Sequence, residues 1–168
     1  MSDSRLRAHA VVMLWLFGLQ FLAGMLLNLF VKIPKTHPGT TGGEYFSRSW
    51  SSLLWALAGG GGWALLVHAS IAVVLFLGAL ALFLRSLGRS GRGWRWASGI
   101  AAFFPLGALF NGLSFLDFDE DFSSMIMAAC WLIAVSLTVF LVARSPRPLE
   151  ARAALQAEGP SGSMRRST

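Results

Sequence analysis

Long apolar runs, separated by short polar segments, make up most of the chain. Four of these runs cover residues 8–31, 63–84, 96–116 and 122–143. Each has roughly the 20 residues that an α-helix needs to cross a hydrocarbon core of about 30 Å. Because backbone groups in lipid must be hydrogen-bonded within their own segment, apolar runs of this length favour helices. The pattern therefore predicts an all-α protein, a four-helix transmembrane bundle formed by residues 1–143.

The composition supports a membrane protein and argues against one that binds nucleic acid. Only 13% of the 168 residues are charged, whereas a soluble domain carries about 25%. The formal net charge is +6, but the basic residues flank the apolar runs instead of forming a stripe on a polar domain. We therefore expect the lipid bilayer, and not a nucleic acid, to be the partner of this chain.

The distribution of basic residues predicts the orientation. If the amino terminus is inside, three inner segments carry eleven arginines, whereas the outer loops carry only Lys32, Lys35 and Arg48. The inner segments are then residues 1–7, 85–95 and 144–168. Cytoplasmic loops of membrane proteins hold the excess of Lys and Arg. We therefore expect both termini in the cytoplasm and a multi-pass protein of a bacterial inner membrane.

Three further segments lie outside the four runs. Residues 49–58 in the first outer loop are largely apolar and include Trp50 and Trp55, but they are too short to span a bilayer. Because indole rings prefer the membrane–water interface, this segment is expected to be a short interfacial helix. The glycines at 59–62 are expected to form a hinge after it. Residues 144–168, rich in Pro, Ser, Gly, Ala and Arg, are expected to be a disordered cytoplasmic tail.

Small and amide residues recur at multiples of four residues in the first and the third apolar runs. They are Gln20, Gly24 and Asn28 in the first run, and Gly99, Gly107 and Asn111 in the third. Positions four apart share a helix face. Small residues let helices approach closely, and amides hydrogen-bond across the gap. We therefore expect these two helices to contact each other, with the three glycines at the packing interface.

A candidate polar site lies in the outer half of the bundle. His68 is the only histidine well inside an apolar run, and it lies roughly 7–8 Å below the outer end of its helix at ~1.5 Å per residue. Asn111 is expected at about the same depth and Asn28 slightly nearer the outer end, and the other residues assigned to this site are Gln20, Ser114 and Ser124. Placing a polar side chain inside a membrane span costs free energy, so such side chains usually face other helices. Two interpretations follow: an outward-facing pocket for a small polar solute or a proton, or an interhelical hydrogen-bond cluster that fixes packing.

Signatures of catalysis, metal binding and cofactor binding are incomplete. His9 and His68 are expected at opposite ends of the hydrocarbon core, too far apart to ligate one haem, and His37 lies in a loop. Cys130 is the only cysteine, which excludes an internal disulfide and a thiolate metal site. The turn at 117–121 resembles the opening of a calcium loop but lacks its glycine and glutamate, so a solvated acidic turn is expected. The sequence predicts no catalytic residue, no metal and no cofactor.

The turn at 85–95 combines four arginines with Trp94 and, just beyond it, Trp96. Such a cluster is typical of ordinary anchoring at the inner leaflet. Contact of the same arginines with anionic lipid headgroups is the alternative.

Three short segments resemble a group of small bacterial four-helix membrane proteins. They are His68 early in the second helix, residues 111–116 at the end of the third, and residues 123–128 at the start of the fourth. The resemblance implies the fold and the membrane location, but no ligand or reaction. Because the sequence has no complete catalytic set and its small-residue helix faces suit packing, we expect a non-enzymatic accessory or structural membrane protein that assembles with itself or with another membrane protein. A small-solute or proton carrier or sensor, and a haem- or quinone-binding redox subunit, are the alternatives.

Overall fold

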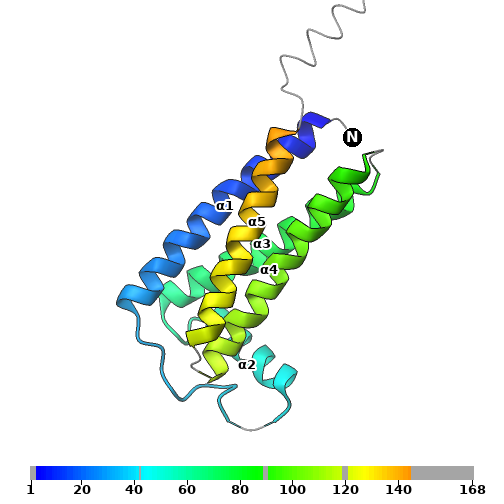
Figure 1. Ribbon diagram of the computed structural model, residues 1–168. Helices are drawn as coiled ribbons and strands as arrows, with labels where there is room; N and C mark the ends of the chain where they lie inside the picture. The colour runs from blue at the N-terminus through cyan, green and yellow to red at the C-terminus, as the bar shows by residue number, and fades with distance from the viewer. Residues whose placement is uncertain (1–2, 42, 89–90, 119–120, 145–168) are drawn as a thin grey trace, which may run out of the picture.

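A computed structural model describes residues 3–41, 43–88, 91–118 and 121–144 of the chain, and these residues form five α-helices (Figure 1). The helices are α1 (Asp3–Phe30), α2 (Tyr45–Leu57), α3 (Trp63–Ser86), α4 (Arg92–Phe118) and α5 (Asp121–Ala143). The all-α prediction is confirmed. Apart from Arg144, the tail predicted to be disordered lies outside the described residues.

Four of the helices, α1, α3, α4 and α5, are long and apolar enough to cross a membrane. They contain almost all of the four apolar runs, and α1 and α4 begin earlier than those runs because helical hydrogen bonding continues into the polar flanks. Only 22–28% of the residues in their most apolar windows are buried by the rest of the protein. Large side chains such as Trp15, Phe21 and Phe103 are therefore exposed on the sides of the bundle, as expected where lipid is the solvent.

The packing order of the four long helices differs from the one expected. α1 packs against α3 and α5, and α4 packs against the same two helices, so α1 and α4 occupy diagonal corners of the bundle. The predicted contact between the first and third spans is therefore wrong. A stripe of small residues shows which face of a helix is approached closely, but it does not identify the neighbour that approaches it.

Each of the three glycines of those stripes faces a helix other than the one expected. A Cβ atom added at Gly24 would lie 3.1 Å from the His68 ring on α3, and one added at Gly99 would lie 3.1 Å from the Phe83 ring, also on α3. At Gly107 the nearest atom is the sulfur of Cys130 on α5, at 3.4 Å. The glycines thus lie at packing interfaces, but those interfaces are α1–α3, α3–α4 and α4–α5.

Small side chains dominate the buried core. The central cluster combines Met13 and Phe17 of α1 with Leu75 of α3 and with alanines, one from each of α3, α4 and α5. Alanines at such positions let helices approach closely without a polar cost. The indole nitrogen of Trp131 donates a hydrogen bond of 3.0 Å to the backbone carbonyl of Phe17, which joins α5 to α1.

The glycines between α2 and α3 form a tight turn. Gly59 and Gly62 have φ values of +81° and +84°, in the region that favours glycine. A Cβ atom at Gly60 would lie 2.0 Å from the indole nitrogen of Trp55. Glycine is therefore required here because the chain reverses directly against a tryptophan ring.

The two ends of the bundle differ in charge. The amino terminus of α1, the carboxyl end of α5 and the turn between α3 and α4 lie at one end, and α2 lies at the other (Figure 1). The first end carries Arg5 and Arg7 of α1, Arg85 of α3, Arg92 and Arg95 of α4, and Arg144 after α5. The second end carries Glu44, Arg48 and Asp117 together with two lysines of the loop before α2. Hereafter these are called the basic end and the α2 end.

Candidate functional site

His68 and Gln20 meet between α3 and α1. The side-chain nitrogen of Gln20 lies 3.3 Å from Nδ1 and 3.2 Å from Nε2 of His68, so this amide is placed to donate to whichever ring nitrogen lacks a proton. The imidazole approaches α1 closely because Gly24 has no side chain to exclude it. The side-chain oxygen of Gln20 is buried and has no hydrogen-bond partner. An unsatisfied buried acceptor of this kind costs about 1–3 kcal/mol.

The other residues predicted to line a polar pocket do not join this pair. Asn111 donates a 2.8 Å hydrogen bond to the carbonyl of Gly107, one turn earlier on its own helix. Ser114 is hydrogen-bonded to the hydroxyl of Tyr45 at 2.7 Å. Asn28 is exposed, and Ser124 is half-buried at the start of α5. The shared depth of these residues was predictable, but the direction in which each one points was not.

Each of the three histidines has a different set of partners. His9 Nδ1 accepts from Arg85 at 3.0 Å near the basic end, and His68 pairs with Gln20. His37 stacks on Trp55 with 4.4 Å between ring centroids, and its two nitrogens lie within 3.1 Å of the carbonyl oxygens of Pro38 and Leu116. No two imidazoles face each other in the described part of the chain. The haem alternative therefore gains no support from the positions of the histidines.

The most extensive polar network in the described residues surrounds Asp117, at the α2 end of α4. Its side chain is only 6% exposed. Ser49 donates to one carboxylate oxygen at 3.0 Å, and Ser52 donates to the other at 2.5 Å. Both serines lie on the buried face of α2. Asp117 therefore holds α2 against the end of α4, and the prediction that it belongs to a solvated turn is wrong.

Arg48 completes this network from the first turn of α2. Its guanidinium donates to the backbone carbonyl of Asp117 at 3.1 Å and to that of Gly39 at 2.7 Å. The same group lies 4.3 Å above the ring of Phe118, a cation–π contact. Arginine suits this position because its planar group donates in several directions at once. The contacts connect the loop before α2, α2 itself and the end of α4.

The loop before α2 is held in the same cluster. Ser52 also lies 3.2 Å from the carbonyl of Pro38. Gly39 has φ of +108°, and a Cβ atom there would overlap Ser52 Oγ at 2.1 Å. The ring of His37 bridges this loop to Leu116 on α4. A glycine, a histidine and two serines thus bring the loop onto the bundle around one buried carboxylate.

Sequence reasoning missed this cluster for an identifiable reason. Asp117 is followed by three further acidic residues, so it was grouped with a charged turn. The available signal was in the segment predicted as a short interfacial helix, where Ser49 and Ser52 are three residues apart and therefore share one helix face. Their neighbours Leu53 and Ala56 on that face are apolar. Two hydroxyls on an otherwise buried face imply a buried polar partner.

No cluster of three or more His, Cys, Asp or Glu side chains that is suited to a metal ion is present among the residues described. Comparisons with protein-family models, with curated proteins and with solved structures find no match to this chain. The resemblance to small bacterial four-helix membrane proteins therefore stays a prediction.

Proposed function

We propose that the chain is a non-enzymatic, multi-pass protein of a bacterial inner membrane with an accessory or structural role. One observation carries this proposal: the polar side chains on its long helices mainly form hydrogen bonds to their own helix backbone or to a neighbouring helix. Asn111 and Ser136 bond to their own helix backbones. Ser86 and Ser98 bond to each other at 2.6 Å between α3 and α4. The bond between α3 and α4 stabilises packing. The bonds within single helices satisfy their polar side chains, so these side chains are not free for chemistry.

The proposed orientation has both termini in the cytoplasm. The sequence segments 1–7, 85–95 and 144–168 carry eleven arginines, against three basic residues in the loop and helix between the first two spans. This bias is the main determinant of orientation in multi-pass proteins. The α2 end then faces outward.

An outer interfacial position for α2 is supported by the way its side chains are divided. Phe46, Trp50 and Leu54 recur every four residues and are exposed, whereas Ser49 and Ser52 are buried against α4. This helix therefore presents a row of large apolar side chains that points away from its own protein. A bilayer surface would cover that face, because aromatic side chains are favoured at the headgroup level.

Cysteine labelling tests the orientation directly. In a Cys130→Ala background, Thr41→Cys and Gly88→Cys each introduce one thiol at an exposed position at opposite ends of the bundle. A membrane-impermeant maleimide applied to intact cells is expected to label Thr41→Cys, and to label Gly88→Cys only after permeabilisation. The reverse pattern would reverse the topology, and labelling of both in intact cells would contradict a four-span arrangement.

The accessory role is tested by isolating the tagged protein in a mild detergent. We expect it to elute as a complex larger than one chain with its detergent, containing either further copies or a second membrane protein. Recovery as a strict monomer with a stoichiometric small molecule would contradict the proposal. An absorption spectrum of the same sample tests the haem alternative, because a bound haem gives a Soret band.

A carrier or sensor of protons or small solutes is the second candidate, because Gln20 Oε1 is buried without a partner beside His68. A bound solute donor, or a water carrying a proton, would satisfy this oxygen. The two functions differ in a reconstituted system. Proton or solute flux in proteoliposomes that is lost in His68→Ala but kept in Asn111→Ala would favour the carrier, whereas no flux above empty liposomes favours the accessory role.

A further inference from the structure

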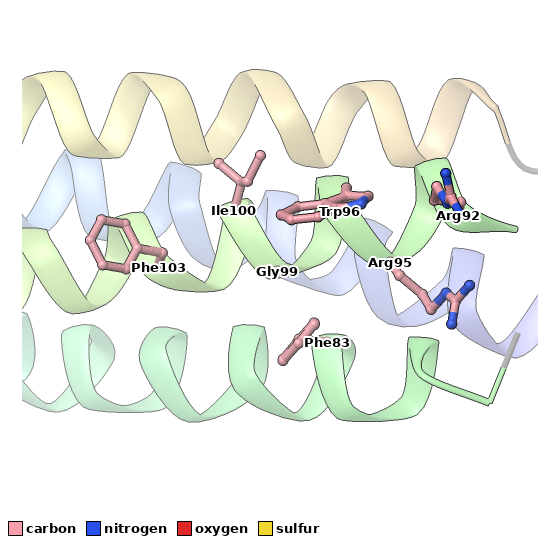
Figure 2. Close-up of a pocket in the computed structure, with 7 residues that line it drawn as sticks. All are labelled: Phe83, Arg92, Arg95, Trp96, Gly99, Ile100 and Phe103. Carbon is pink, nitrogen blue, oxygen red and sulfur yellow. The ribbon is translucent and has the colours of Figure 1, made fainter.

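A hollow of about 500 Å³ lies between α3 and α4 at the basic end. Figure 2 shows Arg92 and Arg95 at one end of it and Phe103 at the other, with Phe83 reaching in from α3. Its length along α4, from Arg95 to Phe103, is about 12 Å at 1.5 Å per residue. This is comparable with most of one leaflet of a hydrocarbon core of about 30 Å. The hollow therefore runs from the headgroup level into the acyl-chain region of a membrane that the bundle spans.

The wall of the hollow is apolar and lies open at the side of the bundle. Trp96 is 68% exposed and Phe103 is 66% exposed, and Ile100 is exposed between them. Gly99 lets the Phe83 ring of α3 lie close to the backbone of α4 beside this wall, because a Cβ atom there would lie 3.1 Å from that ring. The surface is thus shaped to receive a thin apolar chain along α4.

The mouth of the hollow is positively charged. Arg92 and Arg95 are exposed and three residues apart, so they lie on one face in the first turn of α4. Arginines are unfavourable in a first turn, because the helix dipole already places partial positive charge there. Of the described acidic residues, Glu44 and Asp117 belong to the α2 end, whereas Asp3 begins α1 at the basic end. An anion at this mouth would relieve the repulsion among like charges.

We propose that this hollow binds one anionic phospholipid. The guanidinium groups of Arg92 and Arg95 hold its phosphate, and one acyl chain lies against Gly99, Ile100 and Phe103. Arginine pairs with phosphate through two parallel hydrogen bonds, which a lysine cannot form. Basic pockets between spans on the cytoplasmic side suit lipid phosphates in this way. The proposal rests on the membrane placement argued above, but not on the accessory role.

A free phosphate would use the two arginines and leave the apolar wall uncovered. The volume of the hollow lies in the range of about 300–1,000 Å³ that is usual for ligand sites. Burial of an acyl chain there adds contacts that an inorganic ion lacks. A lipid is therefore the occupant that matches both halves of the surface.

Native mass spectrometry of the full chain in a neutral detergent tests the proposal. The probes are phosphatidylglycerol, phosphatidylcholine and inorganic phosphate. We expect one phosphatidylglycerol to bind in preference to phosphatidylcholine, and Arg92→Gln/Arg95→Gln to weaken that binding at least about tenfold. The matched control is Arg5→Gln/Arg144→Gln, which removes two exposed charges at the same end outside the hollow and should change binding less than about twofold. Phe103→Ala should weaken binding without any change of charge.

Three results would overturn the proposal: an equal loss in both double variants, no preference for the anionic lipid, or displacement of the lipid by inorganic phosphate. An equal loss would mean that the arginines act as a diffuse charged surface. Circular dichroism of each variant shows whether it is folded, and Phe103→Ala supplies a test that leaves the arginines intact. The cysteine labelling described above separates the outcomes, because correct topology without lipid binding would remove this inference alone.

Discussion

Replacement of Asp117 by alanine is expected to release α2 from the bundle. The carboxylate accepts one hydrogen bond from Ser49 and one from Ser52, and each hydrogen bond to a charged group is worth about 1.5–3 kcal/mol. Ser52 keeps an alternative acceptor in the carbonyl of Pro38 at 3.2 Å. Ser49 is 2% exposed and loses the acceptor that its hydroxyl has in the cluster. Burial of the carboxylate itself costs free energy, so we expect a net loss of about 2–4 kcal/mol in the docking of α2.

Hydrogen exchange measured by mass spectrometry is the suitable assay, because the opening is local. At about 1.4 kcal/mol for each factor of ten, a loss of 2–4 kcal/mol speeds exchange about 30- to 700-fold. The effect should be confined to peptides from the loop before α2 and from residues 45–57, while peptides from α5 are unchanged. Asp117→Asn should have an intermediate effect, because the amide keeps one acceptor oxygen but loses the charge.

Glu44→Ala is the matched control for this experiment. Glu44 is an exposed acidic residue at the N-cap of the same helix, and its side chain makes no capping hydrogen bond. Its removal should change stability by less than about 0.5 kcal/mol. Unchanged exchange of α2 in Asp117→Ala would refute the reasoning, as would equal acceleration in α5, which would indicate global unfolding.

Three further predictions concern the packing of the long helices, and unfolding in SDS mixed micelles checks each of them. Gly24→Ala should be at least about 1 kcal/mol less stable than Gly18→Ala. A Cβ atom at Gly24 meets the His68 ring, whereas one at Gly18 meets nothing within 4 Å. Equal stabilities of the two variants would contradict the close approach of α1 and α3 at Gly24. A double-mutant cycle of Gln20→Ala and His68→Ala should give a coupling energy of about 0.6–1.7 kcal/mol, and strict additivity would mean that the pair does not interact. Trp131→Phe removes the hydrogen bond to the backbone of α1 and should lower the free energy of unfolding by about 1 kcal/mol. An unchanged midpoint of the SDS unfolding transition would argue against that bond.

The sequence by itself determined the class of the protein and the positions of its long helices. A run of about 20 apolar residues has few alternatives to a spanning helix, because every backbone group in lipid needs a partner within its own segment. The runs at 63–84 and 122–143 therefore lie inside α3 and α5. The described arginines, such as Arg5, Arg85 and Arg144, likewise lie at one end of the bundle, because successive long helices alternate in direction.

Tertiary structure alone decided which polar groups meet. The depth of Asn111 follows from its position in the sequence, but its bond to its own helix and the diagonal placement of α1 and α4 depend on how all four helices pack. Asp117 illustrates the same limit, because the residues next to it in the sequence do not predict that two serines more than 60 residues away will bond to it. Local sequence patterns predict which segments lie in lipid and which form helices. The partner of a buried polar group is instead set by contacts between segments that are distant in the sequence.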